Sequence, residues 1–104
     1  MIRKAFKMRV YPNETEEYFK RHNPIWKSLE DTLRKNGVKN YSIFLDEETN
    51  ILFGYAEIES ETAWEAISDT DICRKWWDHM ADIMDTNSDN SPVSKDLKEV
   101  FHLD

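Results

Sequence analysis

A tyrosine and a histidine four residues apart are the first pair in this sequence whose side chains could do acid–base chemistry. Tyr18 and His22 lie in the stretch YFKRHNPIW, and a spacing of four puts both side chains on one face of a helix. A histidine with an ordinary pKa of about 6.5 can give and take a proton at neutral pH. A histidine and a tyrosine on an apolar stripe are more often core residues with satisfied polar tips. On this pattern alone, the core interpretation is favoured.

Pro24 follows this pair and interrupts the helical pattern. Its nitrogen carries no hydrogen and its ring clashes with the carbonyl one turn back, so a helix through it would bend, or Asn23 would cap a new helix starting at Pro24. In either case we expect the backbone near His22 to depart from regular helical geometry. The histidine could then leave the apolar stripe and face a cavity.

Two adjacent tryptophans, Trp76 and Trp77, offer a broad aromatic surface. Neighbouring residues on a helix diverge by about 100°, so Trp77 should flank the stripe that Trp76 shares with Ile72 and Met80. Flat aromatic faces suit the C–H surface of a sugar ring, and a few hydrogen-bonding groups would complete a small-molecule pocket. The alternative, that both indoles belong to the core or to a dimer interface, is at least as well supported by the sequence alone.

Other kinds of site find little support in the sequence. His22, His79 and His102 lie far apart and the acidic residues are scattered, so we expect no metal site. A glycine-rich phosphate loop is excluded because Gly37 and Gly54 are the only glycines, and no Gly-x-Ser-x-Gly motif occurs. Nucleotide cofactors and acyl-serine chemistry are therefore not expected.

The composition is typical of a folded, soluble protein with a single domain over residues 1–104. Hydrophobic residues make up 39% and aromatic residues 12%, which is too apolar for a disordered chain. The net charge of −7 would repel nucleic acid. No apolar run approaches the roughly 20 residues of a membrane span, and the amino terminus lacks the features of a signal peptide. With Cys73 as the only cysteine, we expect a cytoplasmic protein without disulfides.

Hydrophobic periodicity predicts elements in the order β-α-β-β-α-β. Alternation of period two indicates strands, and apolar residues three and four apart indicate helices. Ser60 can cap the second helix region, and the group Ser68-Asp69-Thr70 interrupts and re-caps it. The predicted elements are a strand over 2–10, a helix region over 14–36, a hairpin over 40–59, a helix region over 61–84 and a last strand over 97–103.

This order is that of the ferredoxin-like α+β fold, in which the third strand lies between the first and the second. Both helix regions then cover one face of the sheet, while the hairpin strands carry apolar residues on both faces. An uncovered apolar sheet face is a liability that a second subunit would remove. We therefore predict a homodimer that packs sheet against sheet.

Taken together, the motifs resemble those of the L-rhamnose mutarotase family over essentially the whole chain. The matching segments are MIRKAF, RHNPIW, NY at the start of the second strand, ILF, EIES, the paired tryptophans, DNSPVS and EVF. Each is short, but their order and spacing together are specific. One departure is His102, where the family has a tyrosine. The resemblance implies a cytoplasmic, cofactor-free isomerase that interconverts the α and β anomers of L-rhamnose, with a dimeric α+β barrel fold.

The resemblance also implies roles for five residues. In the family the histidine of the RHNP segment is the proton donor, which here is His22. Four further positions bind the sugar in the family, and they correspond here to Tyr18, Tyr41, Trp76 and Trp77. All five residues match the family's pattern.

Mutarotation needs one acid and one base, because the ring oxygen gains a proton while the anomeric hydroxyl loses one. We hypothesise that His22 is the acid that protonates the ring oxygen, a role typically worth about 10² to 10⁴-fold in rate. The base could be a tyrosine, an aspartate or an ordered water. Three other functions remain open: a cofactor-free oxygenase of the same fold, a sugar-binding module without turnover, and a purely structural dimer.

Overall fold

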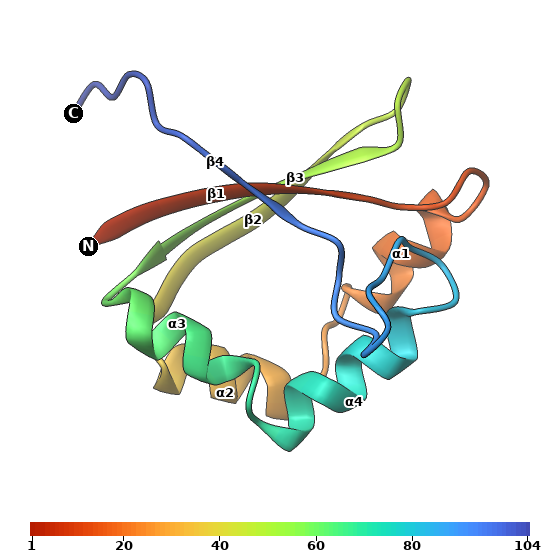
Figure 1. Ribbon diagram of the computed structural model, residues 1–104, viewed down its shortest axis with the longest axis horizontal. Coiled ribbons are helices and arrows are strands. Elements are labelled where there is room, and N and C mark those ends of the chain that lie inside the picture. The colour runs from red at the N-terminus through yellow and green to blue at the C-terminus, as the bar shows by residue number, and fades with distance from the viewer.

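Four strands and four helices make up this protein, whose structure is a computed structural model that describes residues 1–104 (Figure 1). In chain order the elements are β1 (Ile2–Arg9), α1 (Thr15–Arg21), α2 (Lys27–Lys35), β2 (Val38–Asp46), β3 (Ile51–Ile58), α3 (Glu61–Ile67), α4 (Asp71–Met80) and β4 (Lys95–Leu97). The strands form one antiparallel sheet in the order β2-β3-β1-β4, and the helices lie on one side of it. The third strand lies between the first and the second, which confirms the ferredoxin-like α+β prediction.

The face of the sheet toward the helices holds the core. Because side chains alternate between faces along a strand, the even-numbered residues of β1 and β3 point toward the helices, and Phe6, Met8 and Leu52 are buried there. Phe6 lies opposite Gly54 in the pairing of β1 with β3. A Cβ added at Gly54 would lie 2.5 Å from two atoms of the Phe6 ring. The ring therefore packs directly on the backbone of β3.

The opposite face of the sheet, here called the free face, has no helix over it (Figure 1). It carries the odd-numbered residues of β1 and β3, together with Ser42, Phe44 and Asp46 of β2 and Leu97 of β4. Phe44 pairs across the strands with Phe53, and both are exposed, as is Leu97. The free face is thus partly apolar, as the pattern of the hairpin predicted.

The break predicted in the first helix region is confirmed, but it is wider than expected. The chain stops being helical after Arg21, passes through a cis Asn23–Pro24 peptide bond, and becomes helical again only at Lys27. Asn23 does not cap a helix that starts at Pro24, since its side-chain amide instead donates 2.8 Å to the carbonyl of Phe19 and so closes the end of α1. Two separate helices result.

The second helix region divides where the sequence predicted. The Ser60 hydroxyl accepts from the Ala63 N–H at 3.0 Å at the start of α3, and the Thr70 hydroxyl accepts from the Cys73 N–H at 3.3 Å at the start of α4. The predicted continuation of the stripe to residue 84 is wrong. Beyond Met80 the backbone leaves the helix because its polar groups bond to the end of β1, as in the bond from Asp85 N–H to the carbonyl of Arg9 at 3.0 Å.

The last strand is short and lies before the position predicted for it. β4 pairs with the middle of β1, with Leu97 opposite Ala5, and only Leu97 of the predicted segment 97–103 belongs to it. The residues that suggested a strand, Val100, Phe101 and Leu103, are about 80–90% exposed. These apolar side chains therefore do not pack against the core of the chain. None of the four helices combines the length and the apolar character that crossing a membrane requires.

Candidate functional site

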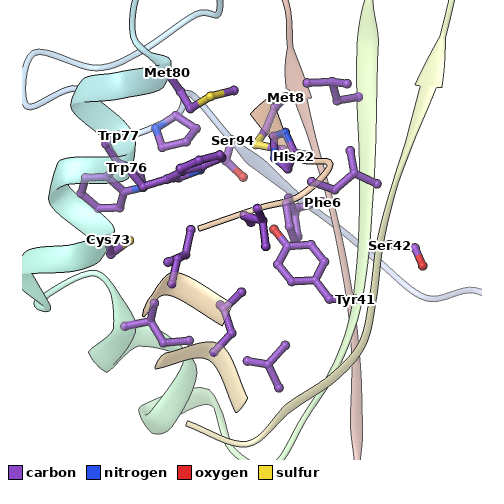
Figure 2. A pocket seen from close by; sticks show the side chains of 18 of the residues that line it. Phe6, Met8, His22, Tyr41, Ser42, Cys73, Trp76, Trp77, Met80 and Ser94 are labelled. Atoms are coloured by element: carbon purple, nitrogen blue, oxygen red, sulfur yellow. The ribbon is translucent and has the colours of Figure 1, made fainter. Parts of the chain in front are cut away.

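A cavity of about 1000 Å³ lies between the inner face of the sheet and the helices (Figure 2). Most of its walls are aliphatic and aromatic side chains. The five residues singled out from the sequence all line it: Tyr18, His22, Tyr41, Trp76 and Trp77. The fold therefore brings together side chains from α1, β2 and α4 that lie up to 59 positions apart in the sequence, between 18 and 77.

His22 lies at the point where α1 ends, and it faces the cavity in a fixed orientation. Its Nδ1 lies 2.9 Å from the carbonyl oxygen of Tyr18. A carbonyl oxygen can only accept a hydrogen bond, so Nδ1 carries the hydrogen and Nε2 of the neutral ring holds a lone pair. Burial lowers the pKa of His22 below its usual value, and the bond to the Tyr18 carbonyl offsets only part of this effect. At neutral pH His22 is thus an uncharged base at Nε2.

Two aromatic rings hold the imidazole between them. The Tyr18 ring stacks on it with centroids 4.3 Å apart, and the Trp76 ring meets it edge to face at 5.1 Å. Next to His22, Arg21 joins α1 to the segment after α4, because its guanidinium donates to a carboxylate oxygen of Asp82 at 2.8 Å. The same guanidinium also donates at 2.8 Å to Glu17, one turn earlier in α1. The wall that carries Trp76 and the helix that carries His22 are therefore held together.

Tyr18 and Tyr41 bring two phenol hydroxyls to the cavity. Both side chains line the cavity, and neither hydroxyl bonds another protein atom, so both are free donors. Burial raises the pKa of both phenols, with a smaller contribution to Tyr18 from Tyr41 and to Tyr41 from the Cys73 thiol. Although 37% of Tyr41 is exposed, its hydroxyl end points into the interior (Figure 2). Both phenols are protonated at any physiological pH.

Tyr41 reaches the cavity through an irregularity in β2. Lys39 pairs with Glu57 and Ser42 with Tyr55, so β2 has one more residue than β3 over this stretch, which is a β-bulge. The Tyr41 ring consequently packs edge to face against Phe6, with centroids 6.2 Å apart. Sequence reasoning did not foresee the bulge.

The two tryptophans combine both roles that the sequence left open. Trp76 is 9% exposed and belongs to the hydrophobic core, and it also forms part of the cavity wall. Its indole contacts Trp26 edge to face, with centroids 5.0 Å apart. Trp77 flanks it, as the helical spacing predicted, and the guanidinium carbon of Arg74 lies 5.7 Å from the centre of its ring.

Several cavity residues were missed by sequence reasoning. Phe6 and Trp64 pack around Tyr41, and Trp64 lies 5.9 Å from both rings, centroid to centroid. The alternation in β1 was a sufficient signal for Phe6, since it placed this residue on the apolar side. Lys4, the one charged residue in that alternation, also lines the cavity, and its amino group pairs with Glu61 at 3.2 Å and Asp96 at 3.4 Å.

The arrangement suits proton transfer to and from a small neutral molecule. A base, Nε2 of His22, and two neutral hydroxyl donors lie in a cavity whose other walls are largely apolar. Such a site can remove a proton from one oxygen of a ligand and supply a proton to another. No group of three or more His, Cys, Asp and Glu side chains lies close enough together to hold a metal ion.

The sequence and the fold can be compared with those of known proteins. L-rhamnose mutarotases from Pectobacterium atrosepticum and Lachnoclostridium phytofermentans are each 56% identical to this chain over 104 residues, which is the full length of both proteins. The crystal structure of an L-rhamnose mutarotase from Formosa agariphila is 45% identical, covers both chains completely and superposes with a TM-score of 0.91.

More distant structures share only the fold. The structure of a putative antibiotic biosynthesis monooxygenase from Nitrosomonas europaea superposes with a TM-score of 0.65 at 16% identity, and the alignment covers 97% of this chain and 100% of the other. The family model described as L-rhamnose mutarotase, in contrast, matches residues 3–103. Together with the full-length identities, this match shows that the chain belongs to the L-rhamnose mutarotase family.

Proposed function

We propose that this protein interconverts the α and β anomers of L-rhamnopyranose by opening and reclosing the sugar ring. The observation that carries the proposal is the orientation of His22. Its Nδ1–H is held by the Tyr18 carbonyl, so Nε2 remains for the ligand, beside the unpaired hydroxyl of Tyr18. Ring opening requires a base and an acid at two oxygens bonded to the same carbon, and these two groups come from adjacent side chains.

In the proposed mechanism, His22 acts first as a base. Nε2 takes the proton of the anomeric hydroxyl while the bond between C1 and the ring oxygen breaks, and the Tyr18 hydroxyl gives its proton to that ring oxygen. The products of this step are an open-chain aldehyde, an imidazolium and a phenolate. After the aldehyde rotates, the imidazolium protonates the aldehyde oxygen and the phenolate recovers its proton as the ring closes on the other face. His22 is then a proton donor during closure.

This assignment differs from the hypothesis drawn from the sequence, in which His22 protonates the ring oxygen. The reason is the charge of the resting imidazole. Since burial lowers its pKa, His22 has no proton on Nε2 to give at neutral pH. Tyr18, with its raised pKa, does hold a proton. The positive imidazolium and the negative phenolate would form next to each other, and their electrostatic attraction would stabilise the pair.

The remaining predicted residues are proposed to bind the sugar. Tyr41 would bond a ring hydroxyl, and Trp76 with Trp77 would pack against the apolar face of the ring and its 6-methyl group. A buried methyl group contributes only about 1–3 kcal/mol to discrimination. We therefore expect the protein to prefer 6-deoxy sugars over 6-hydroxy sugars without excluding the latter.

The test is anomer exchange of rhamnose, followed by saturation-transfer NMR with and without the protein. The wild type should accelerate exchange, and His22→Ala should lose about 10² to 10⁴-fold in rate. The value of kcat/KM should be constant at neutral pH and should fall as the pH decreases below about 6.5, because protonation of His22 removes the base. A kcat/KM that rises toward acid pH would instead assign His22 as the first acid.

Two outcomes would contradict the proposed activity itself. A wild-type protein that binds rhamnose in calorimetry but leaves its exchange rate unchanged would be a sugar-binding module. A protein that neither binds rhamnose nor accelerates exchange would not be a rhamnose enzyme at all.

We also propose that residues 1–104 form a single domain that associates as a cytoplasmic homodimer through the free face. Support comes from the exposed Phe44, Phe53 and Leu97 on this face, and from the free, buried thiol of Cys73. The net charge of −7 argues against nucleic acid as a partner, because it would repel the phosphate backbone. Light scattering at micromolar concentration should give the mass of two chains. A monomer at that concentration would contradict the dimer.

A further inference from the structure

Regular pairing in β2 would place Tyr41 outside the cavity. Lys39 lies opposite Glu57 on the free face. If the pairing continued without an irregularity, Tyr41 would lie opposite Tyr55, on the same free face, because every second residue of a strand points to the same side. In the structure Ser42 takes the place opposite Tyr55. The extra residue turns the side chain of Tyr41 to the other side of the sheet.

Asn40 provides the backbone conformation that makes room for the extra residue. Its φ is +50°, in the left-handed region that asparagine and glycine tolerate better than other residues. Its side-chain amide donates to Glu57 at 2.9 Å, and the second oxygen of the same carboxylate accepts from the Tyr55 hydroxyl at 3.0 Å. The two bonds lower the pKa of Glu57, with that from Asn40 the larger effect. The carboxylate therefore holds the bulge to the neighbouring strand.

We propose that Asn40, held by Glu57, is a positioning residue that directs Tyr41 into the cavity. Asn40 itself borders the cavity, but its side-chain amide is bonded to Glu57 on the free face, so we assign its influence on the ligand to the position of Tyr41. Tyr41 in turn packs against Phe6 and Trp64, which keep its ring pointing inward once the bulge has formed. The inference rests on the proposed function, in which Tyr41 binds the sugar.

The direct test compares substitutions at two asparagines. Asn50 also has a positive φ, +62°, but lies in the turn between β2 and β3 and does not line the cavity. Asn40→Ala and Asn50→Ala both place alanine in the left-handed region, so both should lose stability, and Asn40→Ala also loses the bond to Glu57. Only Asn40→Ala should raise KM for anomer exchange, by about 5- to 10-fold, which corresponds to the loss of one hydrogen bond. Its kcat and pH profile should change less.

Two further variants separate positioning from a general loss of structure. Asn40→Gly permits the positive φ and should keep KM closer to the wild type than Asn40→Ala does. In a Tyr41→Phe background, which lacks the hydroxyl, Asn40→Ala should raise KM no further, because both changes remove the same contact. Unchanged KM in Asn40→Ala, or full additivity with Tyr41→Phe, would overturn the inference while leaving the mutarotase proposal intact.

A readout that needs no activity keeps the two proposals apart. NMR cross-relaxation between the rings of Tyr41 and Trp64 should be present in the wild type and in Asn40→Gly, since the centroids are 5.9 Å apart. It should be weakened or lost in Asn40→Ala. If it persists unchanged in Asn40→Ala, Asn40 does not position Tyr41, whatever reaction the protein catalyses.

Discussion

Substituting alanine for Gly54 should destabilise the protein through a single contact. The added Cβ would lie 2.5 Å from two atoms of the Phe6 ring and 3.1 Å from a third. Phe6 is 5% exposed and packs against Tyr41 and Trp64, so its ring cannot move away freely. Overpacking of this kind costs about 1–3 kcal/mol. For a domain of this size, each kcal/mol lowers the melting temperature by about 4–8 °C.

The measurement is urea unfolding at one fixed protein concentration, because association with a second copy would contribute to the apparent stability. The midpoint should fall while the m-value stays constant. Phe6→Leu, which removes the clashing part of the ring, is the partner variant. The double variant should be more stable, by at least about 1 kcal/mol, than the sum of the two single losses predicts.

Gly37→Ala is the matched control. It also adds a crowded Cβ, but the neighbour is the flexible side chain of Glu59 and φ is +80°. Gly37→Ala should therefore be destabilising without any rescue by Phe6→Leu. If Gly54→Ala and Phe6→Leu are additive within about 0.5 kcal/mol, the close approach of ring and backbone is not the cause and the reasoning fails.

Three other predictions concern groups around the cavity. Arg21→Met should lower the free energy of unfolding by about 1 kcal/mol in urea titrations, because it breaks the bonds between α1 and Asp82. If Asp82→Asn alone causes an equal loss, the stabilising effect of Arg21 comes from its pair with Asp82. Cys73 is buried and its pKa is raised to about 11, so a thiol reagent at pH 7.5 should react slowly with the native protein and fast in urea; fast native labelling would contradict its burial. Since burial lowers the pKa of His22, the unfolded chain binds more protons there, and stability should be constant above about pH 6.5 and decrease below it; His22→Gln should flatten that decrease.

The regular strands and helices could be predicted because the hydrophobic periodicity and the capping residues of each segment favour the element that forms there. Alternation in β1 reflects a sheet with one buried face, and the helix divisions follow from the capping hydroxyls of Ser60 and Thr70 and from Pro24. The tail was misread for a related reason. Val100, Phe101 and Leu103 have strand-forming side chains, but they are exposed and do not pack against the core of the chain.

The site was less accessible to pattern analysis because its residues lie where the regular elements are interrupted. His22 lies at the end of α1, and helical spacing alone favoured a core role for it. Tyr41 shows the limit most clearly, because strict alternation from Lys39 places it on the wrong face. From the sequence, only the resemblance to the mutarotase family identified Tyr41 as a site residue. Asn40, an asparagine near the start of a strand, was the available signal for a bulge.

The hydrogen bond between His22 and the Tyr18 carbonyl also bears on how the catalyst is reset. In the proposed mechanism the same nitrogen removes a proton and returns it within one turnover, and the phenol recovers the proton that it gave. The enzyme thus finishes every cycle in its initial ionisation state, in both directions of the reaction. Recycling needs no exchange with the solvent, so turnover should not depend on buffer concentration at constant pH and ionic strength.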